Sequence, residues 1–254
     1  MIPHIQTQTA NSALLYGKGV FTTISVRSGE AFLWEKHWRR LCDNATQLGI
    51  DLSDFNEFEV RNGLEEAIGE KQLSRGRVRL TLIDISPSRM WGGSEERKTE
   101  LLISAGPKRP RPDQLTLTTS PHLVNSTSPL AGIKSCNYLD HLMSYEEAKA
   151  RGYDEAVRVN EKGHVTSACM ANVFWESGGK LYTPSLTTGC LAGTTREFVM
   201  ENFDCEEVET GIEAVGSAER IFLTSAGLGI VSVAEFNGSR LNISEHRLLE
   251  LLPS

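Results

Sequence analysis

Several features are scarce or missing in this chain of 254 residues, and each absence excludes a class of protein. No apolar run reaches the ~18 residues of a membrane-spanning helix, and the first residues lack the pattern of a signal peptide. The five cysteines are scattered and form no CxxC pair, which argues against a disulfide framework or zinc site and favours a reducing, cytoplasmic setting. Basic residues number 26 against 33 acidic ones, so the net charge of −7 argues against nucleic acid or an anionic membrane as a partner.

Composition and proline placement indicate two folded domains. Hydrophobic residues make up 39% of the chain and charged residues 23%, as in an ordinary globular protein, and the length suits one large or two medium domains. Pro107, Pro110 and Pro112 stand close together and predict a stiff, extended connector. We therefore predict a small N-terminal α+β domain at residues 1–106, a linker at 107–112 and a larger C-terminal domain at 113–254.

Hydrophobic periodicity and helix-ending glycines predict most of the regular elements. Apolar residues three and four apart favour a helix over 35–48 that ends at Gly49, and a second helix over about 55–71. A further helix follows Tyr138. We expect its apolar face to carry Leu139, Leu142, Met143 and Ala148. Strands are predicted at 77–85, 100–104, 115–119, 153–159 and 220–223, and a final helix at 244–252.

Lys134 is the strongest candidate for a catalytic residue. It lies in a short loop, from Gly132 to Tyr138, ahead of a predicted helix. An amine there can form a Schiff base with an aldehyde cofactor and can then move a proton as general base and acid. A single lysine is a weak indication, because most lysines are solvated. The stretch becomes specific through its order: Lys-x-x-Asn-Tyr, a helix with Glu-Glu-Ala, and then Gly-Tyr-Asp-Glu-Ala at 152–156.

This order resembles the lysine-centred core of the fold-type IV pyridoxal-phosphate enzymes, the class IV aminotransferase family. Within that family the chain is most similar to the lyases that act on 4-amino-4-deoxychorismate. The resemblance covers nearly the whole chain from about Tyr16. It implies that Lys134 is the catalytic lysine and binds pyridoxal 5'-phosphate, and that Tyr138 lies near the phenolic oxygen of this cofactor.

Two glycines precede a predicted strand near the N-terminus, a pattern typical of a hairpin entry. The run from Gly17 to Thr23 also resembles Gly-Asp-Gly-x-Phe-Thr-Thr of the lyases. The resemblance implies that Phe21 and Thr23 line the substrate side of the pocket. Lys18 stands where the family usually has an acidic residue.

Two arginines of the N-terminal half match family positions that bind anions. His-Trp-Arg-Arg-Leu at 37–41 resembles the family's His-x-x-Arg-Leu, which implies that Arg40 reaches the cofactor phosphate. Without that resemblance, Arg40 would be read as a solvated arginine beside an apolar helix face. Arg89 lies in a loop whose counterpart in the lyases carries an arginine, so it is a candidate for binding a substrate carboxylate or is simply an exposed loop residue. Asp84 stands where the family often has an arginine.

Residues 166–175 resemble Thr-Glu-Cys-Cys-Ala-Ala-Asn-Leu-Phe-Trp of the lyases, with Asn172 at the matching asparagine. The family glutamate pairs with the pyridine nitrogen of the cofactor and keeps it protonated, which makes the ring a strong electron sink. Ser167 replaces that glutamate, and a hydroxyl cannot hold a full positive charge on the nitrogen. This favours elimination, which needs the sink less, over transamination. An altered or repurposed site is the other interpretation.

A glycine followed by two threonines opens a predicted helix near residue 194. Free amides and the helix dipole at such a terminus favour phosphate, although Gly-Thr-Thr is also an ordinary helix cap. The stretch resembles Leu-Pro-Gly-Ile-Thr-Arg of the family, which implies that Gly193, Thr194 and Thr195 hold the phosphate. By the same resemblance, Ser225 and Ala226 belong to a second loop that contacts phosphate or the substrate carboxylate.

The resemblance implies a fold and a function together. The fold is a two-domain α+β / α/β protein of fold type IV, like D-amino-acid aminotransferase, with a mixed sheet in the larger domain. The chain would act as a homodimer on a small-molecule substrate. The implied reaction is the elimination of pyruvate from 4-amino-4-deoxychorismate, giving 4-aminobenzoate. The alternatives are an aminotransferase of D- or branched-chain amino acids, and a fold-type IV protein with altered chemistry.

Overall fold

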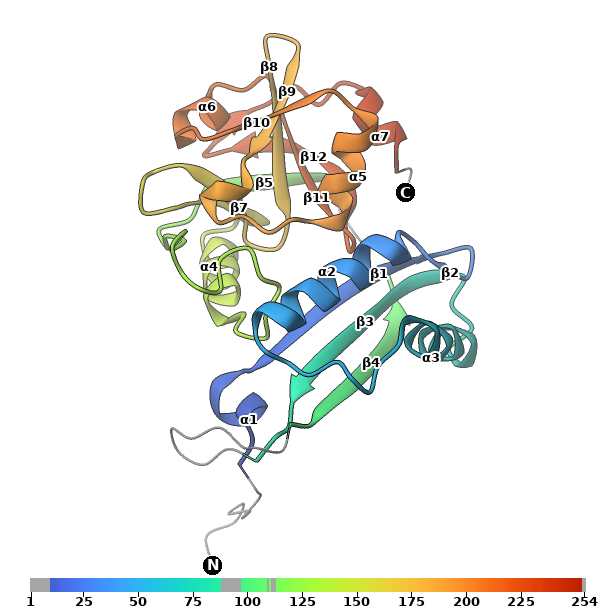
Figure 1. Ribbon diagram of the computed structural model, residues 1–254. Coiled ribbons are helices and arrows are strands. Elements are labelled where there is room, and N and C mark those ends of the chain that lie inside the picture. Colours follow the sequence, from blue (N-terminus) through green and yellow to red (C-terminus); the bar gives the residue numbers. More distant parts are fainter. Residues whose placement is uncertain (1–9, 88–96, 109, 111–112, 253–254) are drawn as a thin grey trace, which may run out of the picture. The chain divides into compact units, whose positions relative to one another are not determined.

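The computed structural model describes residues 10–87, 97–108, 110 and 113–252, and these fall into two compact units (Figure 1). The first unit contains the described residues up to Lys108 together with Lys134–Asn137, and the second contains the remainder. The boundary after Lys108 falls within the expected linker, of which 109, 111 and 112 lie outside the described residues. The grouping of Lys134–Asn137 differs from the expected division, which assigned all of 113–254 to the second domain.

The first unit is a four-stranded antiparallel sheet, in the order β2-β1-β3-β4, with two long helices packed against it. Asn56 caps the second of these helices, since its side chain accepts a hydrogen bond from the amide of Glu59. The elements are α1 (Ser12–Tyr16), β1 (Gly19–Arg27), β2 (Glu30–Ala31), α2 (Trp34–Gln47), α3 (Glu57–Glu70), β3 (Arg75–Asp84) and β4 (Thr99–Pro107).

Alternation along β3 separates a buried face of this sheet from an open one. Val78, Leu80 and Leu82 are buried, as are the inward-facing residues of α2 and α3 that supply the rest of the core. The intervening residues, Arg79 and Thr81 among them, point to the opposite face. The strand therefore presents polar side chains to the face that the helices leave open.

The segment that carries Lys134 adds to the edge of this sheet. The short strand β2 pairs only with the far end of β1, and Ser135 forms an antiparallel bridge with Val20 at the near end. The amide of Phe21 donates to the carbonyl of Lys134 at 2.9 Å, and the amide of Cys136 donates to the carbonyl of Gly19 at 2.8 Å. A Cβ at position 19 would come within 3.0 Å of neighbouring atoms, so only glycine permits this close approach.

The second unit is built on one large mixed sheet in the order β10-β9-β8-β11-β12-β5-β6-β7, with β13 paired to β12. Strands β12, β5 and β6 pair in parallel, as do β10 and β9, and the other pairs are antiparallel. The elements are β5 (Gln114–Thr119), α4 (Leu139–Ala150), β6 (Glu155–Val159), β7 (Val165–Ala168), β8 (Asn172–Ser177), β9 (Lys180–Pro184), η1 (Leu186–Thr188), α5 (Thr194–Asn202), β10 (Cys205–Val208), α6 (Ile212–Gly216), β11 (Arg220–Ser225), β12 (Gly229–Phe236), β13 (Ser239–Arg240) and α7 (Arg247–Glu250).

The two faces of this sheet differ in character. Val157, Ala168 and Val173 belong to the main hydrophobic core, which also takes in residues of β5, β11 and β12. On the other face, Ala148 of α4 packs with Ala156 and Cys169 in a small separate cluster. Because side chains alternate along a strand, Arg158 next to Val157 and Ser167 next to Ala168 lie on this second face.

Three sequence predictions differ from the structure. On α4, Ala148 is buried as expected, but the prediction for Leu139, Leu142 and Met143 is wrong, because these three are exposed and Ser144 is buried instead. The final helix is only Arg247–Glu250 and not 244–252. The strand expected at 100–104 is longer and runs to Pro107, which was assigned to the linker. The sheet tolerates this proline because β4 is an edge strand. Within the described residues, no helix is long and apolar enough to cross a membrane.

Candidate active site

Lys134 is held through its backbone by elements of the first unit. Its amide donates to the side-chain oxygen of Asn44, a buried residue of α2, at 2.9 Å, and its carbonyl accepts from Phe21. The Nζ of Lys134 lies 4.5 Å from the centroid of the Phe21 ring. The amine is therefore directed onto an aromatic surface from a fixed backbone position.

The charge state of this amine is unusual for a lysine. Burial, followed by the positive charges of Arg40 and Arg79, lowers the pKa of Lys134 to about 7. At neutral pH a large fraction of the side chain is thus uncharged and can act as a nucleophile or a base. An unperturbed lysine at this pH is almost entirely protonated.

Arg40 is positioned by a short hydrogen-bond chain between α2 and β1. Its Nη2 donates to the hydroxyl of Thr22 at 2.9 Å, and that hydroxyl lies 2.6 Å from Nδ1 of the buried His37. Burial, then the charges of Arg40 and Lys134, hold the pKa of His37 well below its usual range. A neutral imidazole can accept a hydrogen bond from the Thr22 hydroxyl at Nδ1. The hydrogen bonds of His37 and Thr22 therefore orient Arg40, and His37 adds no second positive charge that would attract an anion.

Phe21 and Thr23 lie on the face of β1 opposite Thr22, where β3 contributes Arg79. Thr23 is the register partner of Arg79, and the guanidinium carbon of Arg79 lies 3.6 Å from the Phe21 ring centroid. Arg79 is exposed, donates to Thr81 and helps to lower the pKa of Lys134. Sequence reasoning placed Arg79 in a strand and assigned it no role. The alternation of β3 could have identified it, because Arg79 falls on the polar face of that strand.

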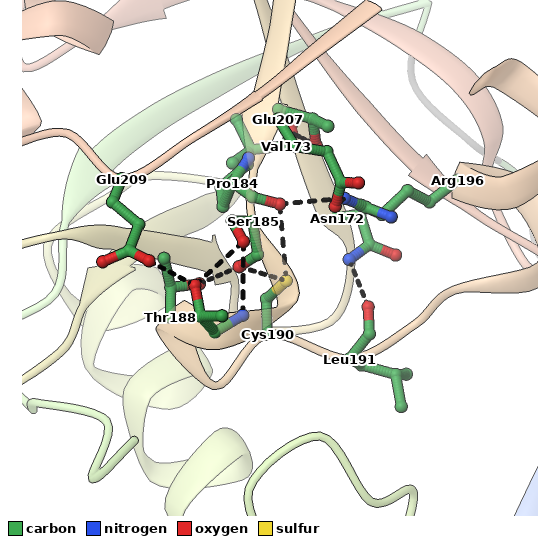
Figure 2. Close-up of polar contacts among 12 residues, drawn as sticks. Asn172, Val173, Pro184, Ser185, Thr188, Cys190, Leu191, Arg196, Glu207 and Glu209 are labelled. Atoms are coloured by element: carbon green, nitrogen blue, oxygen red, sulfur yellow. Dashed lines mark hydrogen bonds and ion pairs between the residues drawn. The ribbon is translucent and has the colours of Figure 1, made fainter. Parts of the chain in front are cut away.

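In the second unit, a tightly fitted glycine precedes the start of α5. Gly193 is the N-cap residue and provides no side chain to the helix amides. A Cβ at this position would collide with the side-chain oxygen of Asn172, whose Nδ2 donates to the carbonyl of Leu191 at 2.8 Å (Figure 2). Thr194 and Thr195 follow and are both buried. Asn172 thus holds the loop next to Gly193 at the start of α5, and the N-terminus of a helix is suited to an anion.

Buried polar contacts brace this loop from behind. Arg196 donates to the carbonyl of Pro184 at 2.9 Å and forms an ion pair with Glu207, and the thiol of Cys190 lies 3.5 Å from the carbonyl of Ser185 (Figure 2). These contacts tie the first turn of α5 to β9 and β10. They make the terminus rigid without using the amides at its tip.

Ser167 lies on the second face of the large sheet, directly opposite Arg158 of the neighbouring strand. Ser167 is 8% exposed. Arg158 is fully buried; its Nη2 lies 3.1 Å from a carboxylate oxygen of Asp140, the side chain of which is 62% exposed. Sequence reasoning included Arg158 only as a member of an alternating strand and missed its position beside Ser167.

The remaining predicted site residues have simpler surroundings. Tyr138 is the N-cap residue of α4, and its ring stacks on His141 with centroids 4.2 Å apart. Ser225 ends β11, and its hydroxyl accepts from the amide of Leu228 across a turn that contains Ala226. Arg89 lies outside the described residues. No cluster of metal-ligating side chains occurs in the part of the chain that the structure describes.

Comparisons with known proteins agree on one family. The sequence matches the profile described as amino-transferase class IV over residues 19–236. An aminodeoxychorismate lyase of Bacillus subtilis is 29% identical over 229 residues, covering 85% of this chain and 77% of that protein. A D-alanine aminotransferase of Bacillus licheniformis is 26% identical over 254 residues, covering 89% and 81%. A solved structure from Legionella pneumophila, titled "Putative 4-amino-4-deoxychorismate lyase", has a TM-score of 0.88 and 26% identity, covering 98% of this chain and 94% of that one.

Proposed function

The chain belongs to the class IV amino-transferase family, and from that premise we propose that it is a lyase that releases pyruvate from 4-amino-4-deoxychorismate to give 4-aminobenzoate. Enzymes of this family depend on pyridoxal phosphate. When bound, that cofactor supplies an aldehyde that takes up an amine covalently and a ring that accepts electron density.

The residues present fit this cofactor. Lys134 has a pKa of about 7 and a backbone fixed by Asn44, which suits a residue that bonds to an aldehyde. Gly193 is the N-cap residue of α5, and a residue with a Cβ would not fit at this position. Thr194 and Thr195 would hold the phosphate there, and Arg40 would supply a charge-assisted contact.

Lys134 would also move the proton that the reaction requires. Released by the substrate amine, its neutral side chain would take a proton from the amine-bearing carbon and return one later in the sequence. Its lowered pKa keeps both protonation states accessible near pH 7. Phe21 lies under the amine and would limit the access of water to it. Thr23 and Arg79 share that strand face and would contact the polar end of the substrate.

The observation that carries the choice of a lyase is the pair formed by Ser167 and Arg158. By the resemblance, Ser167 stands where family members present a carboxylate to the ring nitrogen. Its register partner, Arg158, carries a positive charge. Neither group can keep a pyridine nitrogen protonated. Amino transfer relies on a fully delocalised carbanion, whereas an elimination that yields an aromatic product draws part of its driving force from the product.

The test is a direct assay of the reconstituted protein. With 4-amino-4-deoxychorismate, we expect pyruvate and 4-aminobenzoate in equal amounts, and neither product from Lys134→Ala. Amino transfer from D-alanine and branched-chain amino acids to 2-oxoglutarate is measured in parallel, because the relative from Bacillus licheniformis is a D-alanine aminotransferase. A cofactor-loaded protein that releases no pyruvate but transfers amino groups would replace the lyase proposal with an aminotransferase. Activity in neither assay would leave a fold-type IV protein with altered chemistry.

We also propose a homodimer in the cytoplasm. Leu139, Leu142 and Met143 form an exposed apolar stretch at the start of α4. Burial of these side chains against a second copy would stabilise a dimer. All five cysteines are free, which supports a reducing compartment. Light scattering of the purified protein would give the mass, and a monomer at micromolar concentration would contradict the dimer.

A further inference from the structure

A buried arginine without enough acceptors marks the second face of the large sheet. Nε of Arg158 has no partner among the described residues. Nη1 lies 3.2 Å from Nδ1 of His141, but this same Nδ1 lies 2.8 Å from the carbonyl oxygen of Cys169. Because a carbonyl can only accept, Nδ1 must carry the hydrogen and cannot accept from Arg158. The guanidinium, with five donors, is left with the carboxylate of Asp140 as its acceptor.

Such an arrangement is costly unless another acceptor is supplied. A buried donor without a partner destabilises the fold, and a charged one does so more strongly. Asp140 is largely solvent-exposed, so it compensates the buried charge only in part. The orphaned donors of Arg158 therefore indicate a ligand atom with a lone pair on this face.

Ser167 points to the same conclusion from the neighbouring strand. Side chains that stand directly opposite in an antiparallel pair share a face, with their Cβ atoms about 5 Å apart. Serine is small enough to leave room above the pair for the guanidinium of Arg158. Ser167 is itself nearly buried, with 8% of the residue exposed. A large residue here would occupy this space, and an acidic one would neutralise the arginine.

We infer that Arg158 is the residue that faces the pyridine nitrogen of the cofactor and donates a hydrogen bond to it. This inference rests on the proposed function, and it reverses the usual electrostatics of the ring. A guanidinium stays charged at physiological pH. A fixed positive charge opposes protonation of an adjacent nitrogen, since the protonated ring would carry like charge. The nitrogen keeps its lone pair and accepts from Arg158, and the ring becomes a weaker electron sink.

The groups around Arg158 are consistent with this role. From α4, Asp140 pairs with Nη2, and the His141 imidazole is held in place by the Cys169 carbonyl. From β7, Ser167 contributes a neutral hydroxyl. Asp140 would orient the guanidinium of Arg158 from the solvent side, and the remaining donors of Arg158 would face inward. Arg158 acts on the ring itself, whereas Asp140 is a positioning residue.

The decisive measurement is the ¹⁵N chemical shift of the ring nitrogen in protein reconstituted with ¹⁵N-labelled pyridoxal phosphate. We expect the shift of an unprotonated, hydrogen-bonded pyridine that stays constant from about pH 6 to 9. The double variant Arg158→Met, Ser167→Glu should move it to the protonated value. Ser167→Glu alone should not, because the new carboxylate would pair with Arg158 across the strands.

The matched control is Arg220→Met. Arg220 is also an ion-paired arginine, bonded to Glu176, and its Nε likewise has no partner among the described residues. Its removal should leave the ¹⁵N shift unchanged. A merely structural role for Arg158 predicts that Arg158→Met and Arg220→Met both lower stability and that neither moves the shift. That result would overturn the inference.

Amino transfer provides a second readout. In single-turnover reactions with an amino acid, conversion of the cofactor to its aminated form should be on the order of tenfold faster in the double variant than in Ser167→Glu or the parent. If the double variant fails to fold, the parent shift alone decides, because a protonated ring nitrogen at neutral pH contradicts the inference. Pyruvate release by the parent tests the proposed lyase activity and not the role of Arg158, so the two can fail independently.

Discussion

The ammonium of Lys18 lies 2.7 Å from a carboxylate oxygen of Asp84, and the amide of Asp84 donates to the carbonyl of Lys18. By the resemblance described in the sequence analysis, Lys18 stands where an acid is usual and Asp84 where an arginine is frequent. Taken separately they look like two losses. The structure joins them in one ion pair of reversed polarity at the start of β1 and the end of β3, so the two departures compensate each other.

This pair predicts a charge-swap experiment. Asp84 is 10% exposed and Lys18 35%, so either single reversal, Lys18→Asp or Asp84→Lys, should cost about 1 to 2 kcal/mol of unfolding free energy. The double reversal should recover more than half of that loss. Lys149→Asp, which breaks an exposed pair with Asp154, serves as the control and should cost a few tenths of a kcal/mol. Urea denaturation measures all four, and a double variant no better than the worse single one refutes the coupling.

The same pair adds acid sensitivity. Burial alone would raise the pKa of Asp84, but hydrogen bonds from Lys18 and Ser86 outweigh it and hold the pKa below its usual value. The stabilisation is therefore complete above the unfolded pKa of an aspartate and is lost as the pH falls through the folded one.

The reactivity of Lys134 should follow its lowered pKa. In protein without cofactor, acylation of Lys134 by a small neutral reagent, followed by mass spectrometry, should rise with pH around a midpoint near 7. Arg79→Met removes one of the charges that lower the pKa of Lys134 and should move the midpoint to higher pH. Arg77→Met, two residues away on the same face of β3, should not. An unshifted midpoint in Arg79→Met would show that burial and Arg40 account for the effect.

The tight fit of Gly193 predicts a selective loss of cofactor binding. Gly193→Ala places a Cβ against Asn172 and should push the loop off the tip of α5. We expect the dissociation constant for pyridoxal phosphate to rise about tenfold, or ~1.4 kcal/mol. Gly216→Ala is the control, since its Cβ would meet only Phe236 at 3.9 Å. Equal affinities for both variants in absorbance titrations would mean that this terminus does not hold the phosphate.

Glu155 gives the second unit a pH-dependent stability. Burial raises the pKa of Glu155 to about 7, although hydrogen bonds from Cys169 and the Met170 amide oppose the shift. The folded protein thus retains a proton that the unfolded chain releases near its usual pKa. Stability is highest below that value and falls as the pH rises to about 7.

Glu155→Gln should remove this dependence. Its side-chain oxygen can still accept from Met170, so we expect the variant to be more stable than the parent at pH 8 by about 1 to 3 kcal/mol, with little difference at pH 4.5. Urea denaturation at both pH values measures the change, with the exposed Glu206→Gln as control. If the difference in stability between the parent and Glu155→Gln were the same at pH 4.5 and at pH 8, the raised pKa would be contradicted.

The sequence predicted the elements whose pattern is local. The helices α2 and α3 and the strand β3 follow from apolar spacing, and Gly193 with Thr194 follows from helix-start chemistry. Pairing between distant segments has no such signature. The residues around Lys134 do not predict the bridge between Ser135 and Val20, because the two partners are more than a hundred residues apart in the sequence.

Burial of single residues was equally hidden. An arginine in a strand is ordinarily expected to reach solvent, so Arg158 carried no signal of its own until α4 was placed over β6. The apolar residues at the start of α4 misled for the converse reason. Leu139 and Met143 have the spacing of a core face, yet the unit buries Ser144 and Ala148, and periodicity cannot tell which face of a helix meets the sheet.

The bridge between Ser135 and Val20 also limits how this chain can be recombined with a relative. A fragment that begins at residue 113 encodes the reactive lysine without the strand that fixes it, and one that ends at Lys108 encodes the strand without the lysine. A crossover at the proline-rich connector would therefore separate Gly19 and Asn44 from the backbone they bind. Lys134 and the residues that hold its backbone lie on opposite sides of the connector. A functional chimaera therefore requires that both parent proteins form this backbone contact.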